Sequence, residues 1–407
     1  MKAPSLLAIV LSLAPNGAWA QAWSVRWSAQ AVLAGTHVSP VPGGRSATGL
    51  NVLEPMFMLS AAGFGRHLVL HGTLDLEGLT IPDGVLGIGD WGEGFDDRRH
   101  PHTYAHELMV SGVNLLGRVE QAVNLSLSAG KGFVPFGSDD PMVRPALRFP
   151  VNHHWSQILE RAVAIAGLRA GPVIVEGALF NGDEPERPGQ WPRIGHRFGD
   201  SWSGRVTVMP VDGMELEVSR AKVHSPENRP GAATDQRKWH AGARLDRPLA
   251  AGRFYAMGEW ARTDEAEGFF RFESLLGEAQ WSSGMHRGYY QFERTERPEE
   301  ERTTDPFRSL RPHLENSILG TTRWSVHTAG YGFTFRPVAG KVRVEPMIEA
   351  SYARVADIGG GLFSSRSLYG RVTFWSLTAA IRLATGDTHR MGRYGVAAVS
   401  PGMEHMR

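Results

Sequence analysis

Histidine and carboxylate side chains lie close together in one short stretch of the sequence. In "RHLVLHGTLDLEG", Arg66 to Gly78, the odd positions include His67, His71, Asp75 and Glu77, and the even positions between them are leucine or glycine. Successive side chains of a strand point to opposite faces, so an extended conformation puts the ionisable groups on one face and the leucines on the other. Imidazole and carboxylate groups in this pattern can bind a metal, act in catalysis or simply face water.

More histidines flank two long polar segments. In "RRHPHTYAH" and "NHHW" these are His100, His102, His106, His153 and His154. Three or more imidazoles brought together with His67 and His71 would suit Zn²⁺ or Cu²⁺. The spacing matches no established ligand motif, so the alternative is a set of histidines that hydrogen-bond water or carboxylates.

Ionisable residues also occupy one phase of several other predicted strands. They are Arg205, Glu215, Glu217, His240, Arg244, Glu345 and Glu349. On a lipid-facing surface an Arg or Lys would cost about 2–4 kcal/mol at the bilayer midplane, whereas in a wet lumen opposite charges can pair across neighbouring strands. We therefore predict that these residues line a pore together with His67, His71, Asp75 and Glu77.

The ends and the composition of the chain restrict the class of protein. Residues 1–20 have the pattern of a secretory signal peptide, with Lys2, an apolar run and a small-residue cleavage site. The chain has no cysteine, and 43 Lys and Arg residues balance 42 Asp and Glu residues. After residue 20 there is no apolar run of about 18 residues, which excludes a transmembrane helix, and no basic stripe that favours nucleic acid.

Alternation with a period of two dominates the mature chain and predicts paired strands. The clearest pairs are 53–63 with 66–77, 104–116 with 119–131, 156–169 with 172–181, and 201–210 with 214–224. An opening strand at 22–34 and a closing one at 369–384 bring the total to about sixteen. Longer Gly- and Pro-rich loops fall at 35–52, 78–103, 132–153, 182–200, 225–235, 298–320 and 356–368.

This pattern favours a membrane barrel over a soluble sandwich. The predicted segments run about 11–15 residues, longer than the usual soluble strand and sufficient to cross a bilayer. In lipid such a sheet must close, because an open edge would leave backbone groups unpaired. We predict an all-β, antiparallel transmembrane β-barrel of about sixteen strands with short periplasmic turns and long extracellular loops. The barrel would cover residues 21–384, followed by a periplasmic C-terminal tail at 385–407.

Several loop motifs support this class by resemblance. They are Arg99-His100-Pro101-His102, Asn152-His153-His154-Trp155, Phe180 to Pro185, Asp200 to Arg205 and Ser225-Pro226-Glu227. Together they resemble a family of poorly characterised, loosely porin-like bacterial outer-membrane barrel proteins, over roughly residues 53–230. The resemblance implies an architecture and a location in the Gram-negative outer membrane, and no reaction. The size and the predicted strand count of this chain are also similar to those of anion-selective sixteen-stranded porins. No lysine or arginine run in the sequence matches the basic constriction of those porins.

A hydrolase motif is incomplete. "GDSWSG", Gly199 to Gly204, fails the G-x-S-x-G pattern because its second glycine comes one residue too late. Ser201 also falls at a loop-to-strand junction, whereas His240 is predicted to face inward. We therefore expect no enzymatic activity.

The sequence thus predicts a porin-like channel for passive diffusion of small hydrophilic solutes, without a cofactor. One alternative is a metal-binding or metal-transporting barrel that uses Zn or Cu at the His cluster. A second is a structural or enzymatic barrel plugged by its own loops. The expected partners are outer-membrane lipid and lipopolysaccharide, the barrel-assembly machinery, small solutes and two further copies in a homotrimer, but no nucleic acid.

Overall fold

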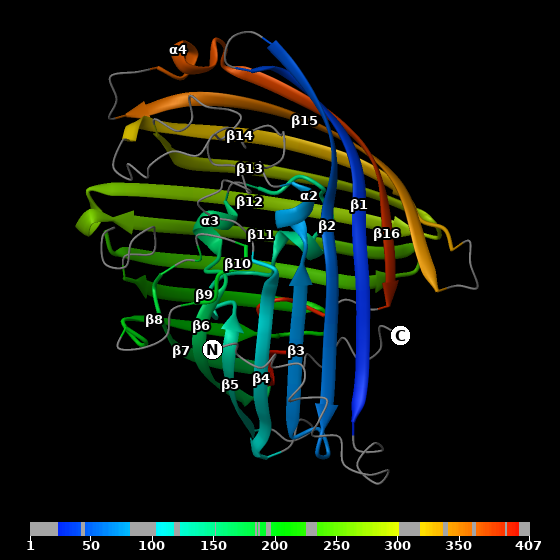
Figure 1. The fold of residues 1–407 in the computed structure, drawn as a ribbon, viewed down its shortest axis with the longest axis vertical. Helices are drawn as coiled ribbons and strands as arrows, with labels where there is room; N and C mark the ends of the chain where they lie inside the picture. The colour runs from blue at the N-terminus through cyan, green and yellow to red at the C-terminus, as the bar shows by residue number, and fades with distance from the viewer. Residues whose placement is uncertain are drawn as a thin grey trace, which may run out of the picture.

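Sixteen antiparallel strands form one closed barrel in the described part of the chain (Figure 1). Each strand pairs with the next, and β1 pairs with β16 to close the sheet. The computed structural model describes residues 23–41, 45–81, 103–117, 123–150, 152–183, 185, 188–192, 197–224, 234–300, 318–336, 341–359, 364–386 and 389–398. The predicted fold class is therefore confirmed.

The strands differ greatly in length around the barrel. They are β1 Ser24–Val41, β2 Arg45–Gly63, β3 Leu68–Asp75, β4 Ala105–Leu116, β5 Val123–Gly132, β6 Arg161–Ala170, β7 Val173–Phe180, β8 Ser201–Val208, β9 Met214–Val223, β10 Gln236–Leu249, β11 Gly252–Glu265, β12 Phe270–Ser283, β13 His286–Glu300, β14 Ile318–Phe333, β15 Val342–Gly359 and β16 Thr373–Gly386. Short helices are α2 Glu77–Thr80, α3 His153–Ser156 and α4 Ser365–Tyr369, with 3₁₀ turns η2 Pro141–Val143, η3 Ala266–Gly268 and η5 Gly395–Ala397.

The wall of the barrel has two parts that differ in strand length. The short wall, β3 to β9, has strands of 8 to 12 residues. The tall wall, β10 to β16 with β1 and β2, has strands of 14 to 19 residues. A tilted transmembrane strand needs about 9–11 residues, so the short wall has little length beyond the bilayer, whereas the tall wall extends past it.

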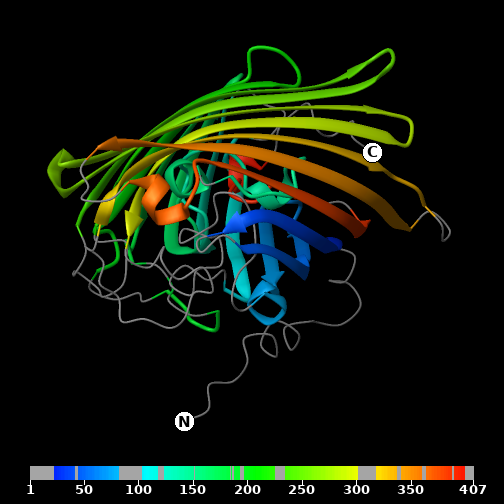
Figure 2. The same cartoon turned by 90° about the horizontal axis from the view of Figure 1, so that it is seen from above.

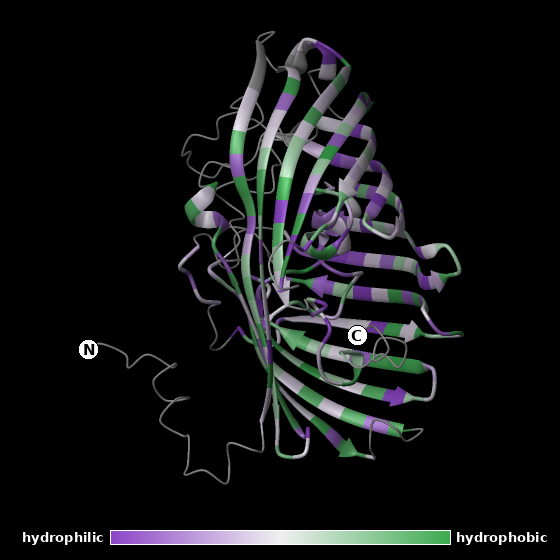
Figure 3. Cartoon of the chain, turned by 90° about the vertical axis from the view of Figure 1, so that its right-hand side faces the viewer, coloured by the Kyte–Doolittle hydropathy of each residue, from purple (hydrophilic) through white to green (hydrophobic). Residues whose placement is uncertain are grey.

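The alternating sequence explains which side of each strand faces out. In β7, Ile174, Glu176 and Ala178 are buried while Val175 and Leu179 are exposed. Figure 3 shows the same alternation as bands of hydropathy along the strands. The exposed apolar side chains include Leu108, Val110, Leu127, Leu168, Val218, Leu275, Ile348, Leu377, Ile381 and Leu383. Such an outer surface suits lipid tails, and the closed sheet leaves the wall no unpaired edge.

Two predicted boundaries at the start of the barrel are wrong. The predicted loop at 35–52 is largely strand, because β1 and β2 stay paired up to Val41 and Arg45. The predicted strand 66–77 is only β3, because a turn with positive φ at Phe64, Gly65 and Arg66 precedes it.

The lumen is filled by two other segments of the same chain. The inward loop, residues 133–160 without residue 151, joins β5 to β6 and lies inside the barrel. The docked tail, residues 389–398, follows β16 and packs beside the loop (Figure 2). One buried apolar cluster contains Phe133, Phe136 and Met142 of the loop and Met391 and Tyr394 of the tail. Of the periplasmic C-terminal tail predicted at 385–407, the described residues 389–398 therefore pack against the inside of the barrel.

Candidate functional site

The inward loop is bound to the tall wall by buried carboxylates. Glu349 on β15 accepts the backbone N–H groups of Leu147 and Arg148 at 2.7 and 3.1 Å. Glu293 on β13 accepts the Arg148 guanidinium at 2.7 Å and the Asn152 N–H at 2.9 Å. The two carboxylates accept backbone N–H groups of the loop as well as the Arg148 guanidinium. They therefore hold the loop backbone in position in addition to compensating the charge of Arg148.

Glu259 on β11 is a third anchor of the loop. Its side chain is 2 % exposed and accepts the Asn152 amide at 2.7 Å, and it pairs with Arg144 at 3.4 Å. Nε2 of His240, on β10, lies 3.1 Å from Oε2 of Glu259. Burial alone would lower the pKa of Arg144, but Glu259 and neighbouring acids raise it above its ordinary value. Arg144 is therefore a fixed positive charge inside the lumen.

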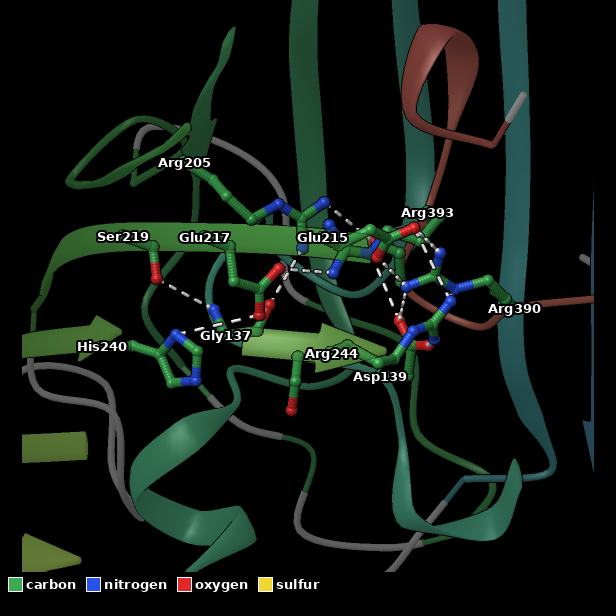
Figure 4. Close-up of polar contacts among 12 residues, drawn as sticks. Gly137, Asp139, Arg205, Glu215, Glu217, Ser219, His240, Arg244, Arg390 and Arg393 are labelled. Carbon is green, nitrogen blue, oxygen red and sulfur yellow. Dashed lines mark hydrogen bonds and ion pairs between the residues drawn. The ribbon is translucent and has the colours of Figure 1, made fainter. Parts of the chain in front are cut away.

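The docked tail is bound to the other side of the lumen by two arginines (Figure 4). Arg390 donates to both carboxylate oxygens of Asp139 at 2.7 and 2.8 Å, and to both of Glu215 at 2.7 and 2.9 Å. Arg393 contacts Asp139 at 3.2 Å and Glu217 at 2.6 Å. Since Asp139 belongs to the inward loop and the two glutamates belong to β9, the tail links the loop to the wall.

An aromatic side chain and backbone contacts complete this binding. Tyr394 is 2 % exposed, donates its hydroxyl to Glu107 on β4 and accepts the Phe133 N–H at 3.1 Å. Burial and the neighbouring carboxylate raise the pKa of Tyr394, so the hydroxyl keeps its proton. Further along, the Val396 N–H donates to Ser126 of β5 at 2.9 Å.

The short wall leaves room for the tail at two glycines. A Cβ added to Gly167 on β6 would lie 2.8 Å from Cγ2 of Val396. One added to Gly132 on β5 would lie 2.5 Å from the Tyr394 hydroxyl. Real Cβ atoms essentially never make contacts this close, so a larger residue at either position requires the side chain of Val396 or Tyr394 to shift.

Asp139 is the electrostatic centre of this arrangement. Burial alone would raise its pKa, but Arg390, Arg244 and Arg393 hold the pKa of this carboxyl well below its usual range. Asp139 and Glu215 likewise raise the pKa of Arg390, although burial acts in the opposite direction. Asp139 therefore remains negative across the physiological pH range and keeps the loop and tail arginines in place.

A cavity of about 450 Å³ remains between the loop, the tail and the tall wall. Its lining includes Gln30, Asp139, Arg144, Arg244, Arg253, Tyr255, Gln280, Arg287, Arg343, Glu345, Arg382, Ala384, His389 and Arg390. Most of these arginines have carboxylate partners, for example Arg253 with Asp246 and Arg287 with Glu345, each at 2.6 Å. The cavity is therefore polar and charged, with its charges largely compensated.

The structure places most of the predicted pore residues inside the barrel, but not on an open pore wall. His71, Asp75, Glu77, Arg205, Glu215, Glu217, His240, Glu345 and Glu349 are buried, and Arg244 is partly buried. Within this set only Arg244 and Glu345 line the cavity. Arg205, for example, pairs with Glu176 at 2.7 Å and donates to the backbone of the loop and the tail. Most of the set holds the lumen segments in place.

His67 and Glu77 depart from the predicted strand. His67 lies exposed in the turn before β3, with its ring Nδ1 3.2 Å from the Val113 carbonyl oxygen. Glu77 begins α2, where its buried carboxylate accepts the Glu54 N–H at 2.7 Å. His67 is therefore not a lumen residue, and Glu77 links α2 to the backbone of β2.

The predicted histidine cluster does not form among the described residues. His106, on β4, contacts Glu160 at 2.6 Å. His153 and His154 stack on each other in α3, which packs against β10 to β12 of the tall wall. No group of three His, Asp or Glu side chains suited to a metal occurs in the described ranges, and His100 and His102 lie outside them. The reason is topological, because β4 and α3 belong to different parts of the barrel.

The residues of the incomplete hydrolase motif also have separate partners. Ser201 donates to Asp200 at 2.7 Å and accepts the His224 N–H at 2.9 Å. His240 instead contacts Glu259.

Sequence reasoning missed Asp139, Arg390, Arg393 and Tyr394. A signal was present in both segments: "FVPFGSDDPMVRPALRFP" is too apolar for a solvated loop, and "HRMGRYG" combines two arginines with an aromatic residue. Apolar side chains in a loop indicate that the loop is buried, although they do not say against which strand.

The helices of the described segments are all too short or too polar to span a bilayer. No family model matches the sequence. A search of curated proteins found no significant match either.

Comparison with solved structures finds outer-membrane porins. The anion-selective porin from Comamonas acidovorans is 12 % identical with a TM-score of 0.50, over 89 % of this chain and 99 % of that one. OmpT, an outer membrane protein of Vibrio cholerae in its trimer form, is 10 % identical with a TM-score of 0.47, over 89 % and 99 %. OmpF of Salmonella typhi, in complex with daunomycin, is 11 % identical with a TM-score of 0.47, over 88 % and 97 %. The closed sixteen-stranded sheet and the match to the Comamonas protein show that this chain has the fold of bacterial outer-membrane porins, in agreement with its predicted location in the outer membrane.

Proposed function

We propose that the protein is a narrow porin-type channel through which small hydrophilic solutes diffuse passively. The observation that carries this proposal is the charged cavity of about 450 Å³ inside a closed barrel. A lumen lined by hydrogen-bonding groups replaces part of the hydration shell of a solute, and conduction also requires that the solute can leave again. Arginines already paired with carboxylates offer such partners without a strong net field.

Planar-bilayer recording and liposome swelling test the channel. Folded protein should give discrete current steps, and liposomes that contain it should admit small uncharged sugars and exclude larger ones. Folded protein that inserts into the bilayer but conducts no ions and admits no sugar would overturn the proposal.

A matched pair of variants ties the conduction to the cavity. Ala384 lines the cavity, whereas its neighbour Leu383 faces outward and is 47 % exposed. Ala384→Trp should reduce the conductance at least twofold and lower the sugar size limit, and Leu383→Trp should leave both unchanged. Equal conductance in the two variants would mean that ions take another path.

The second alternative, a structural or enzymatic barrel plugged by its own loops, stays a prediction, and the packing of the inward loop and the docked tail inside the barrel supports it. Zn or Cu binding stays a prediction that rests on His100 and His102 as well as the described histidines. Association into a homotrimer, contacts with lipopolysaccharide and recognition by the barrel-assembly machinery also stay predictions. The size of the folded protein in detergent, measured by light scattering, tests the trimer.

A further inference from the structure

The docked tail reaches the lumen from the end of the barrel that carries the short turns. β16 ends at Gly386, which pairs with Ser28 near the start of β1. The same end holds the turn between β2 and β3 at residues 64–67. Because short turns face the periplasm in this architecture, the tail enters from the periplasmic side.

Inside the barrel, the tail follows the inner face of the short wall. Near its start, His389 lies 3.0 Å from Glu107 on β4, and Arg390 pairs with Glu215 on β9. Near its end, Val396 bonds to Ser126 on β5 and packs beside Gly167 on β6. The tail thus spans the inner surface from β9 to β4 and occupies volume that a solute would otherwise use.

The wall does not need the tail for its own hydrogen bonds. Strands β4 to β9 pair continuously with one another through their backbones. The tail instead uses side-chain acceptors, mainly Glu107, Asp139, Glu215 and Glu217. When the tail leaves, Arg244 still pairs with Asp139 and Glu215, and water can take the place of the tail at the remaining acceptors.

The tail side of the contact mixes charge with apolar anchors. Met391 and Tyr394 are 0 % and 2 % exposed, and Val396 is 3 % exposed. Burying a paired charge brings little net free energy, because desolvation offsets the attraction, so the apolar anchors supply most of the affinity and the ion pairs fix the register. Such a contact is specific and reversible.

We propose that residues 389–398 form a tethered plug, and that Asp139 with the inner face of the short wall is a binding site for this segment whose vacancy widens the channel. The proposal rests on the channel function proposed above, and it predicts that the site also binds the segment as a separate peptide. The chemistry recognised is a peptide with two arginines three residues apart, followed directly by a tyrosine and a 3₁₀ turn.

Truncation followed by peptide addition tests the plug. A chain that ends at Thr388 should conduct at least twice as much as the full chain in planar bilayers. A synthetic peptide of residues 389–407 should return the truncated barrel to the full-length conductance, and only when added on the side of the short turns. A peptide with Arg390→Ala and Arg393→Ala should not block.

A second pair of variants applies if the truncated chain does not fold. In the full chain, Arg390→Ala with Arg393→Ala should raise the conductance at least twofold. The matched control is Arg262→Ala with Arg271→Ala, two arginines that also share an aspartate, Asp264, but at a distance from the docked tail. The control should conduct like the full chain.

The outcomes separate the plug from the channel. If the full chain conducts and neither truncation nor the Arg390 and Arg393 variant raises the conductance, the plug proposal is wrong and the channel stands. If all inserted forms are silent, the channel proposal fails, and the plug proposal fails with it. Peptide block from both sides of the bilayer would contradict the assigned binding surface.

Discussion

The short wall and the tall wall hold the lumen segments by different means. On the short wall, small inward residues such as Ser126, Ser128 and Gly167 leave space for the docked tail. On the tall wall, long acidic side chains such as Glu293 and Glu349 reach into the lumen and bind the inward loop. The short wall therefore combines this steric fit with the carboxylates Glu215 and Glu217, which bind the tail, whereas the tall wall holds the loop mainly through carboxylates.

This difference separates two roles of inward-facing residues. A small residue positions a segment by letting it approach, and loses that role when it is enlarged. A buried carboxylate positions a segment by pairing with it, and removal of either partner leaves an uncompensated charge. The two walls should therefore respond to different substitutions.

The largest effect is expected at Asp139, which connects the two walls. Asp139→Asn removes the carboxylate that Arg390, Arg393 and Arg244 share, although Glu215 and Glu217 still contact these arginines. Breaking a buried pair costs about 3–5 kcal/mol. Each 1.4 kcal/mol changes the equilibrium between docked and released tail about tenfold. Trypsin should therefore cleave the tail at Arg390 and Arg393 roughly a hundred times faster than in the unmodified chain. The exposed Asp212→Asn is the control. An unchanged cleavage rate would mean that the apolar anchors alone hold the tail.

A smaller effect, confined to the tall wall, is expected at Glu259. Glu259→Gln keeps one acceptor for Asn152 but removes the charge opposite Arg144. This should lower the free energy of unfolding by about 2 kcal/mol. The midpoint of urea unfolding should fall, while tryptic cleavage of the tail changes less than tenfold. If the tail is released as strongly as in Asp139→Asn, the loop and the tail form one cooperative unit and the comparison of the walls breaks down.

A still smaller effect, confined to the short wall, is expected at Gly167. Gly167→Val puts side-chain atoms where Val396 packs, and overpacking of this kind costs about 1–2 kcal/mol. Tail cleavage should accelerate about tenfold without a change in the loop contacts. Gly177→Val on β7 is the matched control, because an added Cβ there meets nothing within 4 Å.

The smallest effect is expected from pH near neutrality. The pKa of Asp139 is depressed in the docked state from an ordinary value of 3.8, so its contribution to docking is complete above that value and is lost as the pH falls below it. Glu215 and Glu217 face the same arginines. The conductance should stay constant within twofold from pH 7 to pH 5 and rise at pH 3. A rise already between pH 7 and pH 5 would contradict this electrostatic account.

The alternation of side chains made most of the barrel predictable. The number of strands, their pairing and the predicted inward phase of Arg205, Glu217 and Glu349 all follow from local sequence. The loop predicted at 132–153 is also present, but it continues to residue 160, because β6 begins at Arg161 and not at the predicted position 156. The boundaries near residues 35–52 and the position of His67 did not, because the length of a hairpin depends on how far two strands stay paired. The partners of the inward-facing residues could not be predicted from the sequence either, because these contacts join residues far apart in the chain.

The sequence by itself determined a closed, lipid-facing sheet, because the period of apolar residues sets which face of each strand meets lipid. Only the tertiary structure decided what fills that sheet. Asp139 and Arg390 are 251 residues apart, and nothing local to either one indicates the other. Closure of the barrel places the inward loop, β9 and the docked tail in one enclosed space, where buried charges are stable only when they are paired. The result is a lumen whose predicted pore residues mainly bind the chain's own segments.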